Sequence, residues 1–115
     1  MIPIQEVDVH TDAKVSFRMH LVRPGSDGPF FTQIFVNDAQ FEIPFSSSVQ
    51  FHQQFDTAKE AFNHGLSWVR KYCVVHSYNI SCINNPCNCE LLRKPDQESV
   101  ANQLGIYSPV QVNGA

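Results

Sequence analysis

A single amphipathic helix limits the fold of this chain more than any other sequence feature. Small and apolar residues recur at the three- and four-residue spacing of one helical face between residues 57 and 73. They are Ala58, Ala61, Phe62, Gly65, Leu66, Val69 and Cys73, with Trp68 and Tyr72 flanking the face. Thr57 and Glu60 have the spacing of a capping box, which predicts the start of the helix, and Asp56 is an alternative cap. A helix with such a face is stable only when it packs on a second layer.

Gly65 indicates how closely that layer approaches. A glycine inside a helix costs about 1 kcal/mol relative to alanine. Gly65 nevertheless lies in the middle of the apolar face. We therefore predict that a strand or an aromatic ring approaches the helix closely at this position.

The segments before the helix predict that the second layer is a β-sheet. Residues 15–21 alternate apolar and polar side chains, as a half-buried strand does. The glycines and prolines of residues 23–29 predict a turn, so the chain should return as a hairpin. Residues 30–36 are apolar on both faces, which is typical of a strand that is covered on both sides or that meets another subunit.

Two further alternating segments complete the predicted sheet. They are residues 41–45 and 49–55, and Pro44 predicts an edge position because proline cannot donate to a β-ladder. Residues 2–9 leave open whether the chain begins with another strand. We predict an α+β fold in which an antiparallel meander of three to five strands carries one amphipathic helix on one face.

The stretch "FDTAKEAFNHGLSWVRKY" resembles small bacterial domains of unassigned function in which a few strands lead into a helix that opens F-D-T-x-x-E-A. The resemblance covers roughly residues 15–73. It implies a sheet with one helix on one face and a bacterial source. It implies no active site, and the cysteine-bearing residues that follow depart from the pattern.

The length of 115 residues is that of one domain. We predict a single α+β domain over residues 1–92 and a C-terminal tail over residues 93–115. Residues 74–80 could form a last strand, whereas residues 82–97 are rich in turn residues and predict a loop. In the tail, residues 98–105 predict two helical turns that end at Gly105, and the end of the chain should be mobile unless it docks.

Charge and apolar runs restrict the compartment and the partners. The net charge is −3, with eight lysine and arginine residues, so binding to a phosphate backbone is disfavoured. The first residues lack the pattern of a secretory signal, and no apolar run approaches the roughly 20 residues that span a bilayer. We expect a cytoplasmic protein with reduced thiols and no membrane partner.

The segment "SCINNPCNCE" brings three of the four cysteines together and is the strongest candidate for a metal site. Cys82, Cys87 and Cys89, completed by His76 or Cys73, would give the thiolate and imidazole ligands that zinc prefers. The spacing supplies only half of the usual two paired knuckles. The alternative is a structural role, with Cys73 in the core, Cys82 as a small buried residue and the last two in a turn. We expect no cofactor other than this possible zinc ion.

The remaining residues indicate a protein that binds a partner and do not indicate a catalytic site. His10, His20, His52 and His64 fall at positions expected to face solvent, and no catalytic triad or nucleotide-binding motif is present. The phenylalanines outnumber what one helix can cover on one sheet face, which predicts a homodimer or a groove for a protein partner. We therefore interpret the chain as a non-enzymatic protein-interaction or regulatory module. The alternatives are a zinc-binding module, an enzyme whose site the sequence does not reveal, and a nucleic-acid binder that stacks bases on its sheet.

Overall fold

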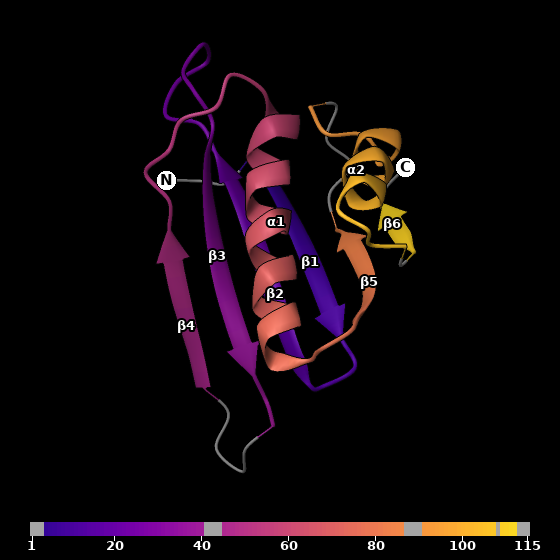
Figure 1. Cartoon of the computed structure of the whole chain (residues 1–115). Coiled ribbons are helices and arrows are strands. Elements are labelled where there is room, and N and C mark those ends of the chain that lie inside the picture. Colours follow the sequence, from indigo (N-terminus) through magenta and orange to yellow (C-terminus); the bar gives the residue numbers. More distant parts are fainter. Residues whose placement is uncertain (1–3, 41–44, 87–90, 108, 113–115) are drawn as a thin grey trace.

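The computed structural model describes residues 4–40, 45–86, 91–107 and 109–112. Within these residues, six strands and two helices follow one another (Figure 1). They are β1 (Gln5–Thr11), β2 (Val15–Val22), β3 (Phe31–Asp38), β4 (Phe45–Gln50), α1 (Ala58–His76), β5 (Ile80–Asn85), α2 (Lys94–Gln103) and β6 (Val110–Val112). The strands form one sheet in the order β4-β3-β2-β1-β5-β6.

The α+β class is confirmed, but the sheet and the helices differ from the prediction. The described residues form a mixed sheet of six strands with two helices, and not an antiparallel sheet of three to five strands with one helix. Strands β1 to β4 form an antiparallel meander, and β1 is the opening strand that the sequence left undecided. The two strands predicted over residues 41–45 and 49–55 are wrong as separate elements, because Phe45–Gln50 form one strand through the serine triplet and residues 51–54 belong to no strand. Residues 41–44 lie outside the described residues. After α1 crosses the sheet, β5 pairs antiparallel with β1, and β6 then joins β5 in parallel. A parallel neighbour requires a crossover connection, and α2 provides it.

The predicted apolar face of α1 is confirmed residue by residue. Its buried residues are Ala58, Ala61, Phe62, Gly65, Leu66, Val69 and Cys73. They pack on the strand residues whose side chains point to the same side of the sheet, namely Val7, Val9, Phe17, Met19, Leu21, Ile34, Val36 and Ile83. The cap is confirmed as well, because the Thr57 hydroxyl accepts a hydrogen bond of 3.1 Å from the Glu60 amide.

The close approach predicted at Gly65 is also present. A Cβ atom there would lie 2.7 Å from Met19 Sδ and 2.8 Å from Thr32 Cγ2. Thr32 is fully buried on β3, and its hydroxyl donates to the Ala61 carbonyl oxygen at 2.9 Å. Only a residue without a side chain lets α1 lie this close to β2 and β3.

The region after the predicted helix face differs from the sequence analysis. Residues 74–76 continue α1 and do not begin a strand, and the helix ends where Ser77 adopts a left-handed conformation with φ of 60°. Its amide then donates to the Cys73 and Val74 carbonyl groups, which satisfies the helix end. The first part of the predicted loop over residues 82–97 is strand β5, because Ile83 points into the core.

The C-terminal residues also supply ordered elements. The predicted short helix is present as α2, but it begins at Lys94, inside the predicted loop, and ends at Gln103, with Pro95 in its first turn. Fully buried Leu92, together with Val100 and Ala101, attaches this region to the core, and α2 contacts both α1 and β6. Residues from the predicted tail therefore complete one end of the sheet.

The large phenylalanine content is distributed over three environments. Phe30 is buried in the core, while Phe31 and Phe35 are half-buried on the face of the sheet that carries no helix. Phe51 and Phe55 are half-buried beside α1. The side chains of Phe41 and Phe45 lie outside the described residues.

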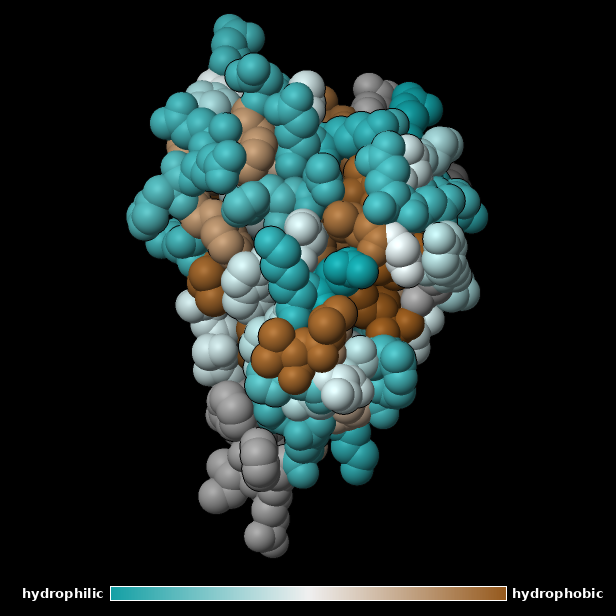
Figure 2. Space-filling view, viewed as in Figure 1, coloured by the Kyte–Doolittle hydropathy of each residue, from teal (hydrophilic) through white to brown (hydrophobic). Residues whose placement is uncertain are grey.

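The helix-bearing face is unevenly apolar at its surface (Figure 2). The large apolar residues that are exposed in the described part of the chain are Val74, Val75, Leu91 and Tyr107, with Val75 at 78%. Among the described residues, neither helix combines the length and the apolar character that crossing a bilayer requires.

Candidate interaction site

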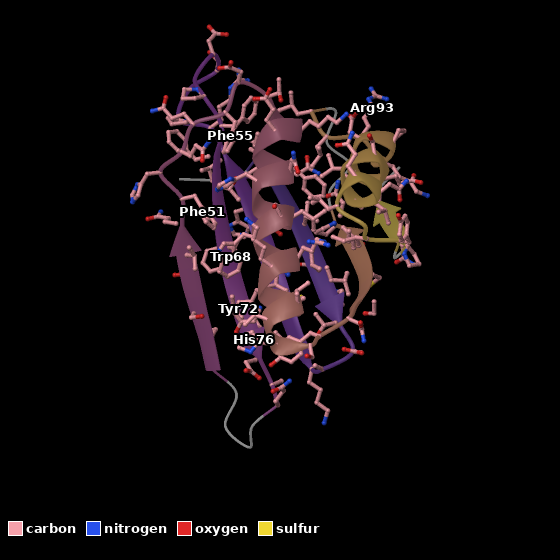
Figure 3. The ribbon with its side chains drawn as sticks, in the orientation of Figure 1. Phe51, Phe55, Trp68, Tyr72, His76 and Arg93 are labelled. Carbon is pink, nitrogen blue, oxygen red and sulfur yellow. The ribbon has the colours of Figure 1, made fainter. Side chains whose placement is uncertain are left out.

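A row of aromatic side chains follows the flank of α1 that faces β4 (Figure 3). Helix α1 supplies four of them at four-residue intervals, and the residues just after β4 and just after α1 supply the others. In spatial order they are Phe55, His64, Phe51, Trp68, Tyr72, His76 and Tyr78. We call this row the aromatic ladder.

Neighbouring rings of the ladder are in contact throughout. Successive centroids lie between 4.4 Å, for Tyr72 and His76, and 6.0 Å, for Phe51 and Trp68. The ring planes meet at angles from 17°, for His76 on Tyr78, to 89°, for Phe51 on His64. Two of these contacts are edge-to-face and one is stacked, which are favoured geometries of aromatic rings, and the other three are tilted.

The inner side of the ladder is fixed by the core. Phe17, which is 1% exposed on β2, meets Trp68 at 6.4 Å and Tyr72 at 5.4 Å in edge-to-face contacts. At one end, Phe55 exchanges two backbone hydrogen bonds with Phe30, of 2.8 and 3.0 Å. At the other end, the Tyr78 hydroxyl lies 3.4 Å from Gln40 Oε1 and donates to it. The rings are therefore positioned before any partner arrives.

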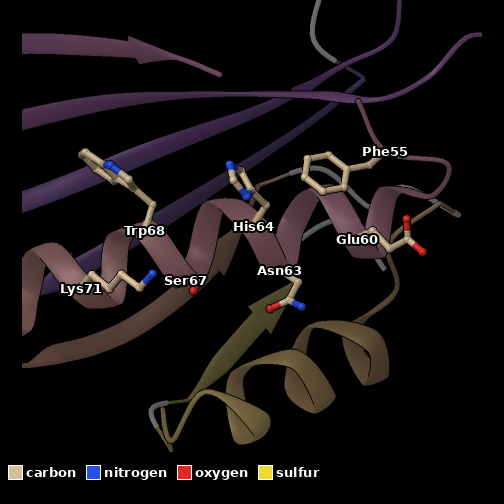
Figure 4. A pocket seen from close by; sticks show the side chains of 7 residues that line it. All are labelled: Phe55, Glu60, Asn63, His64, Ser67, Trp68 and Lys71. Carbon is tan, nitrogen blue, oxygen red and sulfur yellow. The ribbon is translucent and has the colours of Figure 1, made fainter. Parts of the chain in front are cut away.

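The outer side of the ladder is open to solvent. His76 is exposed, and the other six members are half-buried. A hollow of about 440 Å³ opens beside Phe55, His64 and Trp68, and polar residues of α1 border it (Figure 4). These residues are Glu60, Asn63, Ser67 and Lys71, which contribute one acidic and one basic group. The hollow thus combines ring surfaces with a neutral polar rim.

Burial changes the properties of two polar groups within the ladder. It raises the pKa of the Tyr72 phenol, and Tyr78 contributes in the same direction, so this hydroxyl stays a neutral hydrogen-bond donor at physiological pH. His64 lies between Phe51 and Phe55, and its Nε2 atom is buried without a hydrogen-bond partner among the described residues. An unpaired buried nitrogen is unfavourable by about 1 to 3 kcal/mol, so stability alone does not explain an imidazole here.

A second groove lies on the opposite flank of α1. It has a volume of about 270 Å³. Buried Cys73 lies in its wall, and exposed Val74 and Tyr107 also line it. Burial raises the pKa of the Cys73 thiol to about 11, so the thiol stays protonated and weakly reactive. Polar residues such as Arg70 and Asn79 also line this groove, and its thiol is not activated.

The structure does not bring together the zinc ligands that it describes. His76 lies on the ladder, on the helix side of the sheet, whereas Cys82 points to the opposite face, where it is paired with His10 across β5 and β1. Cys73 points into the core, and Cys87 and Cys89 lie outside the described residues. Within the part of the chain that is described, no three histidine, cysteine, aspartate or glutamate side chains cluster around a common point. Zinc binding by the cysteine segment stays a prediction.

The histidines divide differently from the expectation that all four face solvent. His10 and His52 are exposed as predicted. His20 is half-buried, with Nε2 3.4 Å from Glu6 Oε1, and desolvation lowers its pKa in spite of that carboxylate. His64 is half-buried in the ladder. The prediction was wrong because hydropathy alone assigns imidazole to the polar face of the helix.

Sequence reasoning identified Trp68 and Tyr72 as flanking residues but missed the ladder. The signal is the four-residue repeat of His64, Trp68, Tyr72 and His76, which places four rings along one ridge of a helix. His76 lay beyond the predicted helix, and Phe51 and Phe55 lay within a predicted strand.

Comparison of the chain with protein-family models gave no match, and comparisons with curated proteins and with solved structures gave none either.

Proposed function

We propose that this chain is a non-enzymatic protein-interaction module that binds an apolar segment of a partner protein along the aromatic ladder. The observation that supports the proposal is the combination of seven contacting rings, fixed by the core on one side and open on the other. Rigid tyrosine and tryptophan side chains lose little conformational freedom on binding, and they dominate the energetics of protein interfaces.

The chemistry of the ladder restricts the partner segment. Ring faces and edges bind aliphatic, proline and aromatic side chains by burying apolar area, at about 25 cal/mol per Å². The Tyr72 hydroxyl and the polar rim of the hollow can hydrogen-bond to a peptide backbone. The rim holds one acid, Glu60, and one base, Lys71, so it favours a segment without strong net charge.

The alternative of a nucleic-acid ligand uses the same rings, because bases stack on aromatic side chains. Such sites also need a basic groove that follows the phosphates. The rim of the hollow is neutral, and the chain carries a net charge of −3. A protein segment is therefore the better match.

Trp68 is the only tryptophan of the chain, so its fluorescence reports directly on the ladder. We would select peptides of about ten residues from a random displayed library, and titrate them and an oligodeoxythymidylate of similar length against the protein while following Trp68 emission. We expect selected peptides rich in proline or aromatic residues to give a saturable change. His76→Ala, at an exposed rung, should weaken their binding about tenfold, which is about 1.4 kcal/mol.

The matched control is Gln111→Ala, at an exposed position on β6 at the far end of the sheet. It should bind the selected peptides as the unaltered chain does. Peptides that bind equally well to His76→Ala, or a library that yields no binder that changes Trp68 emission, would contradict the proposal. Saturable binding of the oligonucleotide instead would support the nucleic-acid alternative.

A further inference from the structure

Strand β4 forms one edge of the sheet, and its outward-facing backbone groups can be assigned. The Phe51 amide donates to the Thr32 carbonyl oxygen at 3.1 Å, so Phe51 and Thr32 are a hydrogen-bonded pair. Hydrogen-bonded and non-hydrogen-bonded pairs alternate along an antiparallel ladder. The backbone groups of Ser47 and Val49 therefore face β3, as those of Phe51 do. Those of Ser46, Ser48 and Gln50 face the free edge.

Within the described residues, this edge lacks the features that usually protect an edge strand from pairing. Natural edges carry lysine, proline or a bulge, or are very short, or lie under a helix. The strand reads Phe-Ser-Ser-Ser-Val-Gln, without a charge or a proline, and its pairing with β3 is regular over all six residues. Ser46, Ser47, Ser48 and Gln50 are exposed, and α1 lies over β2 and β3 (Figure 1). The other edge, β6, has three residues in the described part of the chain.

We propose that β4 pairs with β4 of a second copy of this chain, antiparallel, around a two-fold axis that passes beside Ser48. Side chains that are opposite each other must lie on the same face, which restricts the register to axes at a residue. The axis at Ser48 places Ser48 opposite Ser48, and Ser46 opposite Gln50. All three residues with outward-facing backbone groups are then hydrogen-bonded to the second copy. With an axis at Ser47, only Ser46 and Ser48 would form such bonds, and Gln50 would lie opposite no residue of the strand.

The chemistry of the edge favours a second copy over another partner. Two-fold pairing places each side chain opposite a residue of the same strand, so a charged edge repels itself. Here the opposed pairs are serine with serine, serine with glutamine and serine with valine, and no charge meets a like charge although the chain has a net charge of −3. A serine hydroxyl both donates and accepts, so it is complementary to its own copy.

The pairing would create a platform that one chain does not have. Antiparallel edge pairing keeps the same face of both sheets on the same side, so both α1 helices would lie on one face of a continuous sheet with twice the six strands. Each aromatic ladder runs along the flank of α1 that faces β4, so the two ladders would face each other across the junction (Figure 3). The dimer does not depend on whether the ladders bind a partner.

Light scattering and a cysteine pair test this dimer. We expect the unaltered chain to give a mass near 26 kDa, twice its 13.0 kDa, and Ser48→Lys to shift the mass to that of a monomer without loss of fold in circular dichroism. Ser81→Lys, at an exposed position on β5, is the matched control and should stay dimeric. A monomer at concentrations up to about 1 mM, or a dimer that Ser48→Lys leaves intact, overturns the proposal.

Disulfide formation tests the register. The Cα atoms of a hydrogen-bonded antiparallel pair lie about 5.5 Å apart, within the range of roughly 4.4 to 6.8 Å that a disulfide spans. Under mild oxidation, Ser48→Cys should therefore form a disulfide that joins position 48 of one copy to position 48 of the other. Mass spectrometry of the linked peptide identifies this bond against the four natural cysteines as background. Ser47→Cys, opposite Val49 in this register, should form no such bond. Efficient linkage at position 47 and none at 48 overturns the register and the axis beside Ser48.

Discussion

Substituting Gly65 with alanine tests how the helix meets the sheet, because two effects of opposite sign compete there. In an exposed helix interior the change from glycine to alanine gains about 1 kcal/mol. At Gly65 the new methyl group would lie 2.7 Å from Met19 Sδ and 2.8 Å from Thr32 Cγ2, which is closer than carbon and sulfur atoms pack. One of the neighbours, or the helix itself, must move.

The identity of the neighbours decides the outcome. Met19 is flexible and can withdraw, but it is fully buried and has little free space. Thr32 is β-branched, and its hydroxyl is held by the hydrogen bond to the Ala61 carbonyl. Overpacking costs about 1 to 3 kcal/mol, and weakening a buried hydrogen bond costs about 1 kcal/mol more. After subtraction of the helix gain, we expect Gly65→Ala to lower the free energy of unfolding by about 2 kcal/mol.

Urea denaturation followed by circular dichroism measures this difference. Asn63→Ala is the matched control, since Asn63 is exposed on the same helix and should gain about 0.5 kcal/mol from propensity alone. If Gly65→Ala is as stable as Asn63→Ala, the sheet does not approach α1 as closely as described here. A loss of stability in both variants would instead mean that alanine is unfavourable along the whole helix, and the argument from Met19 and Thr32 would be wrong.

Three further substitutions test other parts of the fold. Gln5→Leu should raise the free energy of unfolding by about 1 to 3 kcal/mol, because Gln5 is 1% exposed and neither atom of its side-chain amide has a hydrogen-bond partner among the described residues. A urea titration in which the Gln5→Leu variant is less stable than the unaltered chain would contradict this prediction. Thr57→Ala should lower stability by about 1 kcal/mol in the same assay through loss of the helix cap. The pKa of Asp12 should lie below its ordinary value, because the Asn79 backbone and side-chain amides donate to it, and Asn79→Ala should raise it part of the way in an NMR titration. Since the pKa is lowered in the folded state, this pair stabilises the fold above the unfolded pKa of about 4, and the contribution is lost as the pH falls through the folded value.

The helix face and the strands β2 and β3 could be predicted because local periodicity determines them. Phe62, Leu66 and Val69 recur with the helical period, and the buried residues of β2 recur with period two, so the pattern alone identifies which side chains are buried. Gly65 was informative for a similar reason, since a glycine on an apolar face has few explanations other than close packing.

Strands β5 and β6 could not be predicted because their signal is not local. In β5, Ile83 is flanked by polar residues and by asparagines, so the alternation that marks a strand is nearly absent. Strand β6 has three residues and is held by its parallel pairing with β5, which depends on how α2 returns the chain. Fully buried Asn85 and Gln97 near these elements also gave no sequence signal, because amides are usually exposed.

The ladder was missed for a different reason. Hydropathy placed the imidazole of His64 with the charged residues, and His76 lay beyond the predicted helix, although both pack as rings. Of the ladder's other members, Phe55 takes its position from a backbone bridge to Phe30, and Phe51 from a backbone hydrogen bond to Thr32, so both depend on residues far apart in the sequence. A search for rings at four-residue spacing would have found the helix half of the ladder and not the half that completes it.

The two ends of the sheet differ in a way that determines where this chain can interact. At the β5 end, the C-terminal residues add β6 and pack α2 beside α1, so the last long strand is paired and the outermost one is short. At the β4 end no element is added in the described residues, and an edge of six residues stays open next to the aromatic ladder. Burying apolar area and satisfying backbone groups are separate driving forces, and the β4 end offers both along an edge of six residues. A partner that meets the ladder and a second copy that meets the edge would therefore occupy adjacent surfaces, and each interaction can be removed without the other, by His76→Ala and by Ser48→Lys.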